Sequence, residues 1–228
     1  MKVNLIRFPL DGEARIKKII SRSNTKPTGK YPSWKMGRMI HWEHIDQLNL
    51  FRLLDINPAI NSFAESPMEI QYEMDGRIYC EYPDVLITSG NQKEIWKIKK
   101  SNEEAVMTTS NCKSFGEQLL EKGFRWRIVD ADSLRLEPRN QNTITLLKYG
   151  KTPINLVEKE KIRNYLTQYK TISWGEVITG VIGPSGPRNI CHLVMEGDIY
   201  FDINQIWSSG TLFYWNDIHS EKPKGNRL

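Results

Sequence analysis

Closely spaced β-like runs around one Asp-Gly pair constrain the fold more than any other feature of the sequence. Asp75-Gly76 separates two of these runs, and an Asp-Gly pair in this setting is the strongest short-range signal for a β-hairpin. Pro83 follows the second run and leads directly into an apolar stretch. The runs lie at residues 69–74, 77–82, 84–88 and 94–99. The sequence therefore predicts several consecutive short strands in the first half of the chain.

Helical patterns flank these strands on both sides. Residues 42–55 place apolar side chains at helical spacing, and Asn57-Pro58 ends the pattern because proline disfavours a helical conformation of the residue before it. A second helix is expected at residues 102–122, ending at Gly123, and residues 124–129 are typical of another strand. Strands flanked by helices in this way predict an α/β domain.

A second domain is expected beyond residue 150, because the composition changes near residues 149–153. Its predicted elements are helices at residues 154–169, from 173 onward and at 188–195, and strands at 199–203 and 211–215. The helix that starts at Ser173 has Glu176 three residues on, which is the pattern of a capping box. Three helices followed by a β-hairpin is the order of a winged helix, a fold that binds DNA in some proteins and docks proteins in others.

Length and composition exclude several classes of protein. With 228 residues, 39% of them hydrophobic, the chain is long enough for one large or two small packed domains. No apolar run approaches the roughly 20 residues of a membrane helix, and the start has no signal-peptide pattern, so we expect an intracellular protein with no membrane partner. The three cysteines and four histidines show no paired zinc-ligand spacing, which argues against structural zinc and against a disulfide framework.

The net charge of +5 is concentrated at the N-terminus. Residues 1–40 contain ten Lys or Arg and only two acids, so the remainder of the chain is net acidic. Such a segment, interleaved with Tyr31 and Trp34, suits a polyanion such as DNA, and a solvated, poorly ordered terminus is the alternative. The residues predicted to bind DNA are Lys17, Lys18, Arg22, Lys26, Lys30, Lys35 and Arg38.

An acid and two lysines on neighbouring predicted strands are the candidate reactive groups. Asp84 starts one strand, and Lys97 and Lys99 lie two residues apart on the next, so both lysines face the same side. A metal-dependent phosphodiesterase needs such groups. The carboxylate holds a divalent cation that polarises the phosphate, while the lysine stabilises developing negative charge. The spacing of these residues by itself would equally well be explained by an ordinary salt bridge.

A series of motifs follows one order along most of residues 36–215. The series consists of residues 36–42, the helix at 43–55, residues 58–67, the Asp-Gly hairpin, residues 82–84, the strand at 96–99 and the downstream winged-helix pattern. In this order the motifs resemble the TnsA family, the endonuclease subunits of heteromeric DNA transposases. The resemblance lies in the ordered combination, since no single motif would suffice.

The resemblance implies an α/β fold of the restriction-endonuclease type, with a PD-(D/E)xK core and a C-terminal winged-helix-like domain. In this family a helix glutamate, the Pro-Asp aspartate and the lysine of the following strand carry the chemistry with Mg²⁺ or Mn²⁺. Carried over one by one, Asp84 matches the metal-binding aspartate and Lys99 the lysine. The glutamate position falls at Gln47, and Lys97 would offer its backbone carbonyl to the metal. We accordingly expect a basic N-terminal arm at residues 1–35, an endonuclease-like domain at 36–150 and a winged-helix-like domain at 151–228.

Gln47 and Lys97 depart from the family pattern. Glutamine keeps the size of glutamate but loses its charge, so a hard cation would have one anionic ligand fewer. Lys97, where the family has Glu or Gln, would repel a cation if its side chain pointed at the metal. Glu43, one helical turn before Gln47, and Asp46 beside it could complete the site, or they could be ordinary solvated acids of the helix.

The resemblance further implies a hydrolase that cuts the 5′ ends of a transposon during DNA transposition and recombination. Its implied partners are the double-stranded DNA of the transposon ends, a DDE-type transposase subunit that cuts and joins the 3′ ends, and an AAA+ regulator ATPase. A prokaryotic, nucleoid-associated location would follow. The departures at Gln47 and Lys97 favour an alternative, a subunit that has lost cleavage and docks DNA and the regulator. A solitary restriction-like or repair nuclease is a third alternative.

Overall fold

The computed structural model describes residues 1–20, 27–99 and 109–216, and the chain forms two compact units. Unit 1 comprises residues 1–55 and 59–136, and unit 2 comprises residues 56–58 together with the chain from residue 137 onward. Helices and β-sheet are present in both units, which confirms the prediction of a mixed α/β protein.

The division between the units falls after Leu136, earlier than the boundary near residue 150 that composition indicated. The helix α3 (Arg139–Tyr149) accounts for the difference, because it packs on α6 (Gly186–Glu196) of unit 2 and buries Leu146 and Leu147. Composition marks the loop that follows α3, whereas packing decides to which unit α3 belongs.

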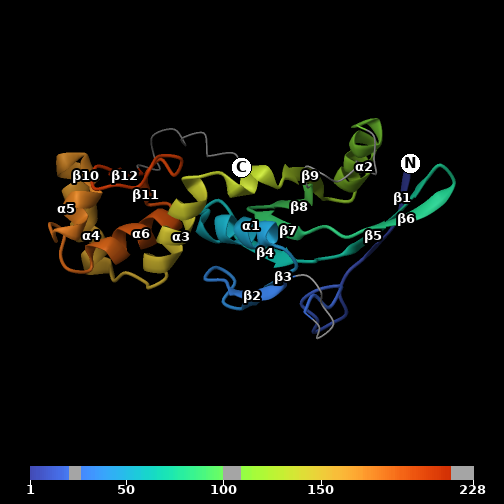
Figure 1. The fold of residues 1–228 in the computed structure, drawn as a ribbon, viewed down its shortest axis with the longest axis horizontal. Coiled ribbons are helices and arrows are strands. Elements are labelled where there is room, and N and C mark those ends of the chain that lie inside the picture. The colour runs from blue at the N-terminus through green and yellow to red at the C-terminus, as the bar shows by residue number, and fades with distance from the viewer. Residues whose placement is uncertain (21–26, 100–108, 217–228) are drawn as a thin grey trace. The chain divides into compact units, whose positions relative to one another are not determined.

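One sheet of unit 1 carries the candidate site. Its strands are, in order, β4 (Ser62–Glu65), β7 (Val85–Ser89), β8 (Gln92–Lys99) and β9 (Arg125–Asp130). Strands β7 and β8 are antiparallel, whereas β8 and β9 are parallel and α2 (Thr109–Glu121) precedes β9 in the chain. The helix α1 (Ile45–Ile56) packs on this sheet (Figure 1). Phe51 of α1 stacks on Phe63 of β4, with ring centroids 5.9 Å apart.

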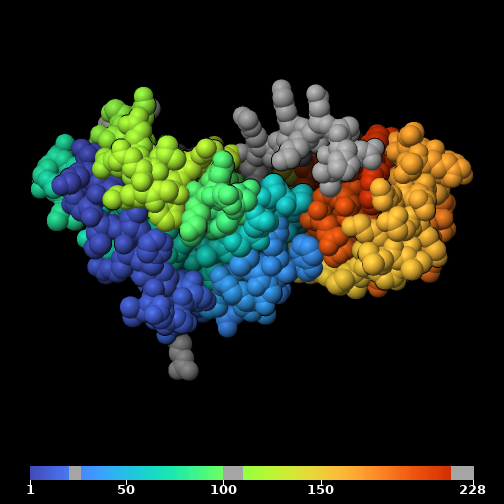
Figure 2. Space-filling view, turned by 180° about the vertical axis from the view of Figure 1, so that it is seen from behind, coloured from blue at the N-terminus to red at the C-terminus, as the bar shows by residue number. Residues whose placement is uncertain are grey.

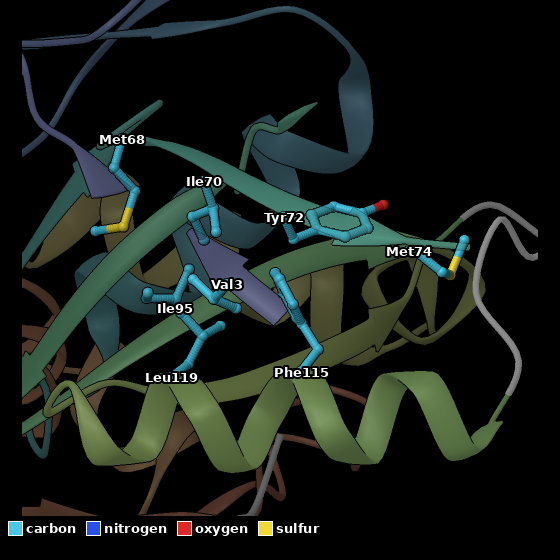
Figure 3. Packing of buried hydrophobic residues seen from close by; sticks show 8 residues of the cluster. All are labelled: Val3, Met68, Ile70, Tyr72, Met74, Ile95, Phe115 and Leu119. Carbon is cyan, nitrogen blue, oxygen red and sulfur yellow. The ribbon is translucent and has the colours of Figure 1, made fainter. Parts of the chain in front are cut away.

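A second sheet of unit 1 shares a core with α2. Its strands are, in order, β1 (Lys2–Arg7), β5 (Glu69–Met74) and β6 (Arg77–Glu81). The predicted hairpin is confirmed, and both turn residues have positive φ, 50° at Asp75 and 71° at Gly76, as a type I′ turn requires. In Figure 3, Phe115 and Leu119 of α2 point toward the strands that carry Val3 and Ile95. The core cluster consists of Val3, Met68, Ile70, Tyr72, Met74, Ile95, Phe115 and Leu119.

The described residues of the basic N-terminal segment, 1–20 and 27–35, belong to unit 1, so they do not form the separate arm expected at residues 1–35. β1 pairs with β5 and buries Val3, and β2 (Gly29–Pro32) pairs with β3 (Met39–Trp42). In Figure 2 the dark-blue N-terminal residues lie on the surface of unit 1, against the lighter blue of the segment that follows. Pairing with a distant strand, which local periodicity does not report, is what holds β1 in place.

Unit 2 carries helices followed by a small antiparallel sheet. After α3 the elements are α4 (Leu156–Tyr169), β10 (Thr171–Ser173), α5 (Trp174–Ile178), α6, β11 (Ile199–Tyr200) and β12 (Leu212–Trp215). β12 lies between β10 and β11. The predicted capping box is confirmed, because the Ser173 hydroxyl accepts from the amide of Glu176 while the Glu176 carboxylate accepts from the amide of Ser173 (2.7 Å).

Within residues 1–20, 27–99 and 109–216, no helix is both long and apolar enough to cross a membrane. The three cysteines are free thiols.

Candidate functional site

Asp84 lies where α1 meets β7 and β8. The proline before it has no amide hydrogen and fixes the backbone ahead of the strand. The Asp84 amide donates to the carbonyl of Trp96 on β8 (2.9 Å), and the Asp84 carbonyl accepts from the amide of Ser66 after β4 (3.1 Å). The Asp84 side chain reaches α1, and the residue is 7% exposed. Its backbone is therefore fixed from two sides, and its carboxylate is buried.

Gln47 of α1 contacts this carboxylate directly, as the resemblance implied for that position. Its Nε2 donates to Oδ1 of Asp84 (2.6 Å), while its Oε1 accepts from the amide of Glu43 (2.7 Å). The second oxygen of Asp84, Oδ2, accepts from the amide of Ile98 on β8 (2.7 Å). Gln47 is 4% exposed. We call Gln47, Asp84 and the two backbone amides that bond to them the amide–carboxylate bridge.

Asp84 stays ionised although it is buried. Burial by itself raises the pKa of this carboxyl, but a hydrogen bond from His44, the charge of Lys97 and the bonds from Ile98 and Gln47 together hold the pKa below its usual value. Nε2 of His44 lies 3.7 Å from Oδ1 of Asp84. The bridge therefore contains one negative charge at neutral pH.

The two lysines of β8 have different environments. Nζ of Lys97 donates to the carbonyl of Tyr82 (2.9 Å) and pairs with the carboxylate of Glu81 (2.7 Å), so this side chain is held beside the loop before β7. Lys99 is exposed at the end of β8, and within the described part of the chain its ammonium group makes no hydrogen bond or ion pair. Lys97 is the lysine whose charge lowers the pKa of Asp84, whereas Lys99 is the one that the resemblance assigns to catalysis.

The backbone carbonyl of Lys97 points away from Asp84, which corrects its assignment as a metal ligand. The Trp96 carbonyl faces β7, where it accepts from Asp84, whereas the Lys99 carbonyl accepts from Ala131 after β9 (2.9 Å). Successive carbonyls along a strand point to opposite edges, so that of Lys97 faces β9 together with that of Lys99. In the parallel β8–β9 ladder, Lys97 stands opposite Ile128.

The acids that could have completed a metal site are engaged elsewhere. Glu43 forms an ion pair with Lys17 (3.0 Å), and Asp46 accepts two bonds from the guanidinium of Arg135 (2.6 and 2.9 Å). Such a two-point pair fixes the carboxylate on its arginine. Neither acid replaces the charge that Gln47 lacks.

The donors around Asp84 consequently do not fit a divalent cation. Mg²⁺ requires oxygen ligands in near-octahedral geometry. Both oxygens of Asp84 instead accept N–H bonds, and the part of Gln47 that faces them is the NH₂ group. Among the residues that the structure describes, no group of three or more His, Cys, Asp or Glu side chains is placed to hold a metal ion.

Five cations of the N-terminal segment lie in unit 1, and we call them the basic strip. It consists of Arg15, Lys17, Lys18, Lys30 and Arg38. NH1 of Arg15 lies 2.7 Å from Nδ1 of His41, and Lys30 stands opposite His41 in the β2–β3 pair. Lys17 joins the strip to the bridge, because it pairs with Glu43, whose amide bonds to Gln47.

A buried acid orients the two arginines of the strip. Glu65 is 1% exposed, accepts two bonds from Arg38 (3.0 and 2.7 Å) and lies 3.3 Å from Nε of Arg15. Burial, followed by the charge of Arg15, lowers the pKa of His41, so its ring is neutral at pH 7 and Nδ1 accepts from Arg15. A guanidinium has five N–H donors, so this pairing leaves donors free for a further acceptor.

Lys35, another predicted DNA contact, does not join the strip. Lys35 donates to the carbonyl of Ile60 (2.7 Å), and burial lowers its pKa to about 8, with partial compensation by Asp55. Its ammonium group is thus part of the packing of unit 1. Arg22 and Lys26 lie outside the described residues.

Sequence reasoning missed three residues that organise this region: Asp55, Glu65 and Arg15. Asp55 accepts hydrogen bonds from Tyr31, Ser33, Trp34 and Lys35. These partners lie 20 to 24 residues away in the chain, and an acid in a helix carries no local sign that it will be buried. Of these three residues, only Glu65 lies in one of the motifs recognised in the sequence, the one at residues 58–67.

Unit 2 contains a groove of about 410 Å³ between α3, the start of α5 and the loop before β12. Trp174 and Trp207 pack edge to face in its wall, with ring centroids 5.0 Å apart, and Ile206 beside them is 78% exposed. Lys148 lies over the ring of Tyr149 (5.1 Å) and is the one charged side chain among the described residues that line the groove. The groove is therefore lined by aromatic and aliphatic side chains together with polar ones (Gln141, Asn142 and Thr145) and one cation.

The comparisons with known proteins return little. No protein-family model and no curated protein matches the chain. Among solved structures, the chain is similar to protein VC1899 from Vibrio cholerae, with 18% sequence identity and a TM-score of 0.28. The match covers 55% of this chain and 32% of that one, so the chain spans about a third of the length of VC1899.

Proposed function

We propose that this chain is the TnsA-like subunit of a heteromeric DNA transposase, and that it binds transposon-end DNA and docks a regulator without hydrolysing DNA itself. The observation that carries the proposal is the basic strip, which Lys17 and Glu43 connect to an amide–carboxylate bridge that has no set of oxygen ligands for a cation. The ordered motifs that resemble the TnsA family support the transposase assignment. The mixed α/β architecture of unit 1 is compatible with the nuclease-type core that this resemblance implies.

The basic strip suits a phosphodiester backbone. Arg15 and Arg38 are oriented by Glu65, so little conformational entropy is lost when their free donors meet a phosphate. Lys18 and Lys30 are exposed and add charge without a fixed geometry. Phosphate contacts of this kind position a protein on DNA and do not read its sequence. Sequence recognition and strand cutting would then belong to the DDE-type subunit.

Unit 2 suits a docking role better than a DNA-reading role. Its order α4, β10, α5, α6, β11, β12 supports a winged-helix-like domain, in which α6 would be the helix that enters a major groove. A reading helix needs an exposed polar face, whereas α6 is covered by α3 and α5 and buries most of its residues. The groove, with Trp174, Ile206 and Trp207 in its lining, is the better candidate surface, and we assign it to the AAA+ regulator.

Lys30→Ala and Lys18→Ala test the DNA-binding part of the proposal. Both side chains are exposed and make no ion pair with a described residue, so the fold should survive. Each lost phosphate contact should weaken binding to transposon-end DNA and reduce the slope of log affinity against log salt by roughly 0.9. Lys93→Ala, an exposed lysine elsewhere on unit 1, is the matched control. An unchanged slope in the double variant would mean that the strip is not the DNA surface.

Cleavage of the 5′ ends, with Mg²⁺ or Mn²⁺ as cofactor, is the second candidate function. It is favoured by one observation, that the helix position implied for the catalytic glutamate contacts Asp84. Cutting of end DNA by the complete assembly with the unmodified chain, lost on Lys99→Ala, would favour this candidate. Lys99 is exposed, so this change tests chemistry rather than folding. The docking role instead requires that transposition tolerates Lys99→Ala.

A further inference from the structure

The amide–carboxylate bridge joins two buried side chains, the carboxamide of Gln47 as donor and the carboxylate of Asp84 as acceptor. The amide of Glu43 donates to Oε1 of Gln47, Nε2 of Gln47 donates to Oδ1 of Asp84, and the amide of Ile98 donates to Oδ2 of Asp84. These three bonds are 2.6 to 2.7 Å long. Every side-chain oxygen of Gln47 and Asp84 thus accepts at least one bond, and the NH₂ group supplies the donor between them. The site is complete as it stands.

The orientation of the Gln47 carboxamide is determined by its neighbours. Turning the group over would set its oxygen against the carboxylate of Asp84 and its NH₂ against the amide N–H of Glu43. Both contacts would then be repulsive, because each would join two acceptors or two donors. The NH₂ group therefore faces Asp84.

An oxygen in place of this NH₂ group would change what the site requires. Two carboxylate oxygens would lie at hydrogen-bond distance in a buried position, and such a pair needs a proton or a cation between them. A divalent cation with two carboxylates and several waters is a common arrangement for Mg²⁺. We propose that the Gln47 carboxamide takes the place of a divalent cation, so that this chain holds its site without metal, and that Gln47→Glu alone makes the site dependent on one.

The neighbouring charged side chains do not neutralise a second carboxylate at position 47. Lys97 is paired with Glu81, and His44 approaches Asp84 at 3.7 Å. The acids nearest Gln47 in the chain, Glu43 and Asp46, are held by Lys17 and Arg135. The positive charge that a second buried carboxylate would need is therefore not supplied in full by neighbouring side chains.

Combining Gln47→Glu with Asp84→Asn would reverse the direction of the hydrogen bond between the two side chains, so that position 84 donates and position 47 accepts. The NH₂ group introduced at position 84 would donate to the carboxylate introduced at position 47, and the carboxamide oxygen at position 84 would accept from the amide of Ile98. The carboxylate at position 47 would still accept from the amide of Glu43. All three hydrogen bonds are kept with the same number of charges. Asp84→Asn alone cannot keep them, because the new carboxamide would then face donors on both sides.

The test compares the full-length wild type, Gln47→Glu, Asp84→Asn and the double variant by thermal unfolding, each in EDTA and in saturating MgCl₂, CaCl₂ or MnCl₂. We expect the wild-type Tm to be the same in EDTA and in divalent salt. Gln47→Glu should have a lower Tm in EDTA and should regain on the order of 5 °C in divalent salt. The double variant should be more stable than either single variant and should not respond to divalent salt. Mn²⁺ titration followed by EPR should find one bound ion in Gln47→Glu and none in the wild type.

Three results would overturn the proposal: a wild-type Tm that rises with divalent cation as much as that of Gln47→Glu, a folded Gln47→Glu that neither binds Mn²⁺ nor responds to it, or a double variant less stable than both single variants. If Gln47→Glu does not fold in EDTA, the wild type and the double variant still decide the outcome. DNA binding is not a readout here, so failure of the proposed function would leave this test intact.

Discussion

Asp55 is the residue on which the loop after β2 depends. It is fully buried, and its two oxygens accept four hydrogen bonds of 2.5 to 3.0 Å from two hydroxyls and two backbone amides. Asp55→Asn would place an NH₂ group against donors and leave buried groups unsatisfied, so we expect a loss of about 2–4 kcal/mol in the free energy of unfolding. Urea denaturation measures it. Asp75→Asn in the hairpin turn, where Asn tolerates positive φ, is the control and should change little.

Lys35 and Tyr31 give unit 1 a defined pH dependence. Burial lowers the pKa of Lys35 to about 8, below the unfolded value of about 10.4, so above pH 8 the unfolded chain binds a proton that the folded chain has released. Burial, then the charge of Asp55, raises the pKa of Tyr31, so above about pH 10 the unfolded chain loses a proton that the folded chain keeps. The contribution of Lys35 should therefore raise stability from pH 8 to 10, and that of Tyr31 should lower it above pH 10.

Lys35→Met and Tyr31→Phe separate these two contributions. Relative to the wild type, Lys35→Met should flatten the rise between pH 8 and 10, and Tyr31→Phe should flatten the fall above pH 10, in urea unfolding at each pH. Identical pH profiles for wild type and Lys35→Met would contradict the assignment.

The capping box of α5 is the clearest case in which an element follows from its sequence. Both bonds of the box are present, whereas Ser185, the N-cap of α6, makes no side-chain cap bond. Ser173→Ala should therefore cost about 0.5–2 kcal/mol in the free energy of unfolding, and Ser185→Ala distinctly less. Equal losses in the two variants would show that the box does not stabilise α5.

Other elements show where local signals fail. The strand predicted at residues 199–203 ends at Tyr200, because the side chain of Asp202 accepts from the amide of Asn204 (2.9 Å) and starts a turn. β1 was missed because it is ordered by pairing with β5, more than 60 residues later, rather than by its own periodicity. The hairpin at Asp75-Gly76 was predictable because a type I′ turn restricts which residues can form it.

At the scale of the whole molecule, one part of the candidate site could be predicted from the sequence. The contact between Gln47 and Asp84 was expected from the order of motifs along the chain. The engagement of Asp46 by Arg135, 89 residues away, was not, and neither was the folding of the basic segment onto Glu65. Ion pairs between distant residues depend on the packing of elements, which no local pattern encodes. The ion pair with Arg135 is also what makes Asp46 unavailable as a metal ligand.

The two units should carry separable functions, and the last prediction tests this in the full chain. Ile206→Asp puts a charge on the rim of the groove of unit 2, where the side chain is 78% exposed, so it should abolish binding of the AAA+ regulator without unfolding the protein. Leu156→Asp is the matched control, because Leu156 is 79% exposed on the same unit and does not line the groove. Lys30→Ala should show the opposite pattern, with weaker DNA binding and normal regulator binding. Affinities for both partners, measured on all three variants by calorimetry, check the prediction. A loss of DNA binding in Ile206→Asp, or an equal loss of regulator binding in Leu156→Asp, would contradict the assignment of DNA binding to unit 1 and of regulator binding to the groove of unit 2, because the effect would then not be specific to the groove.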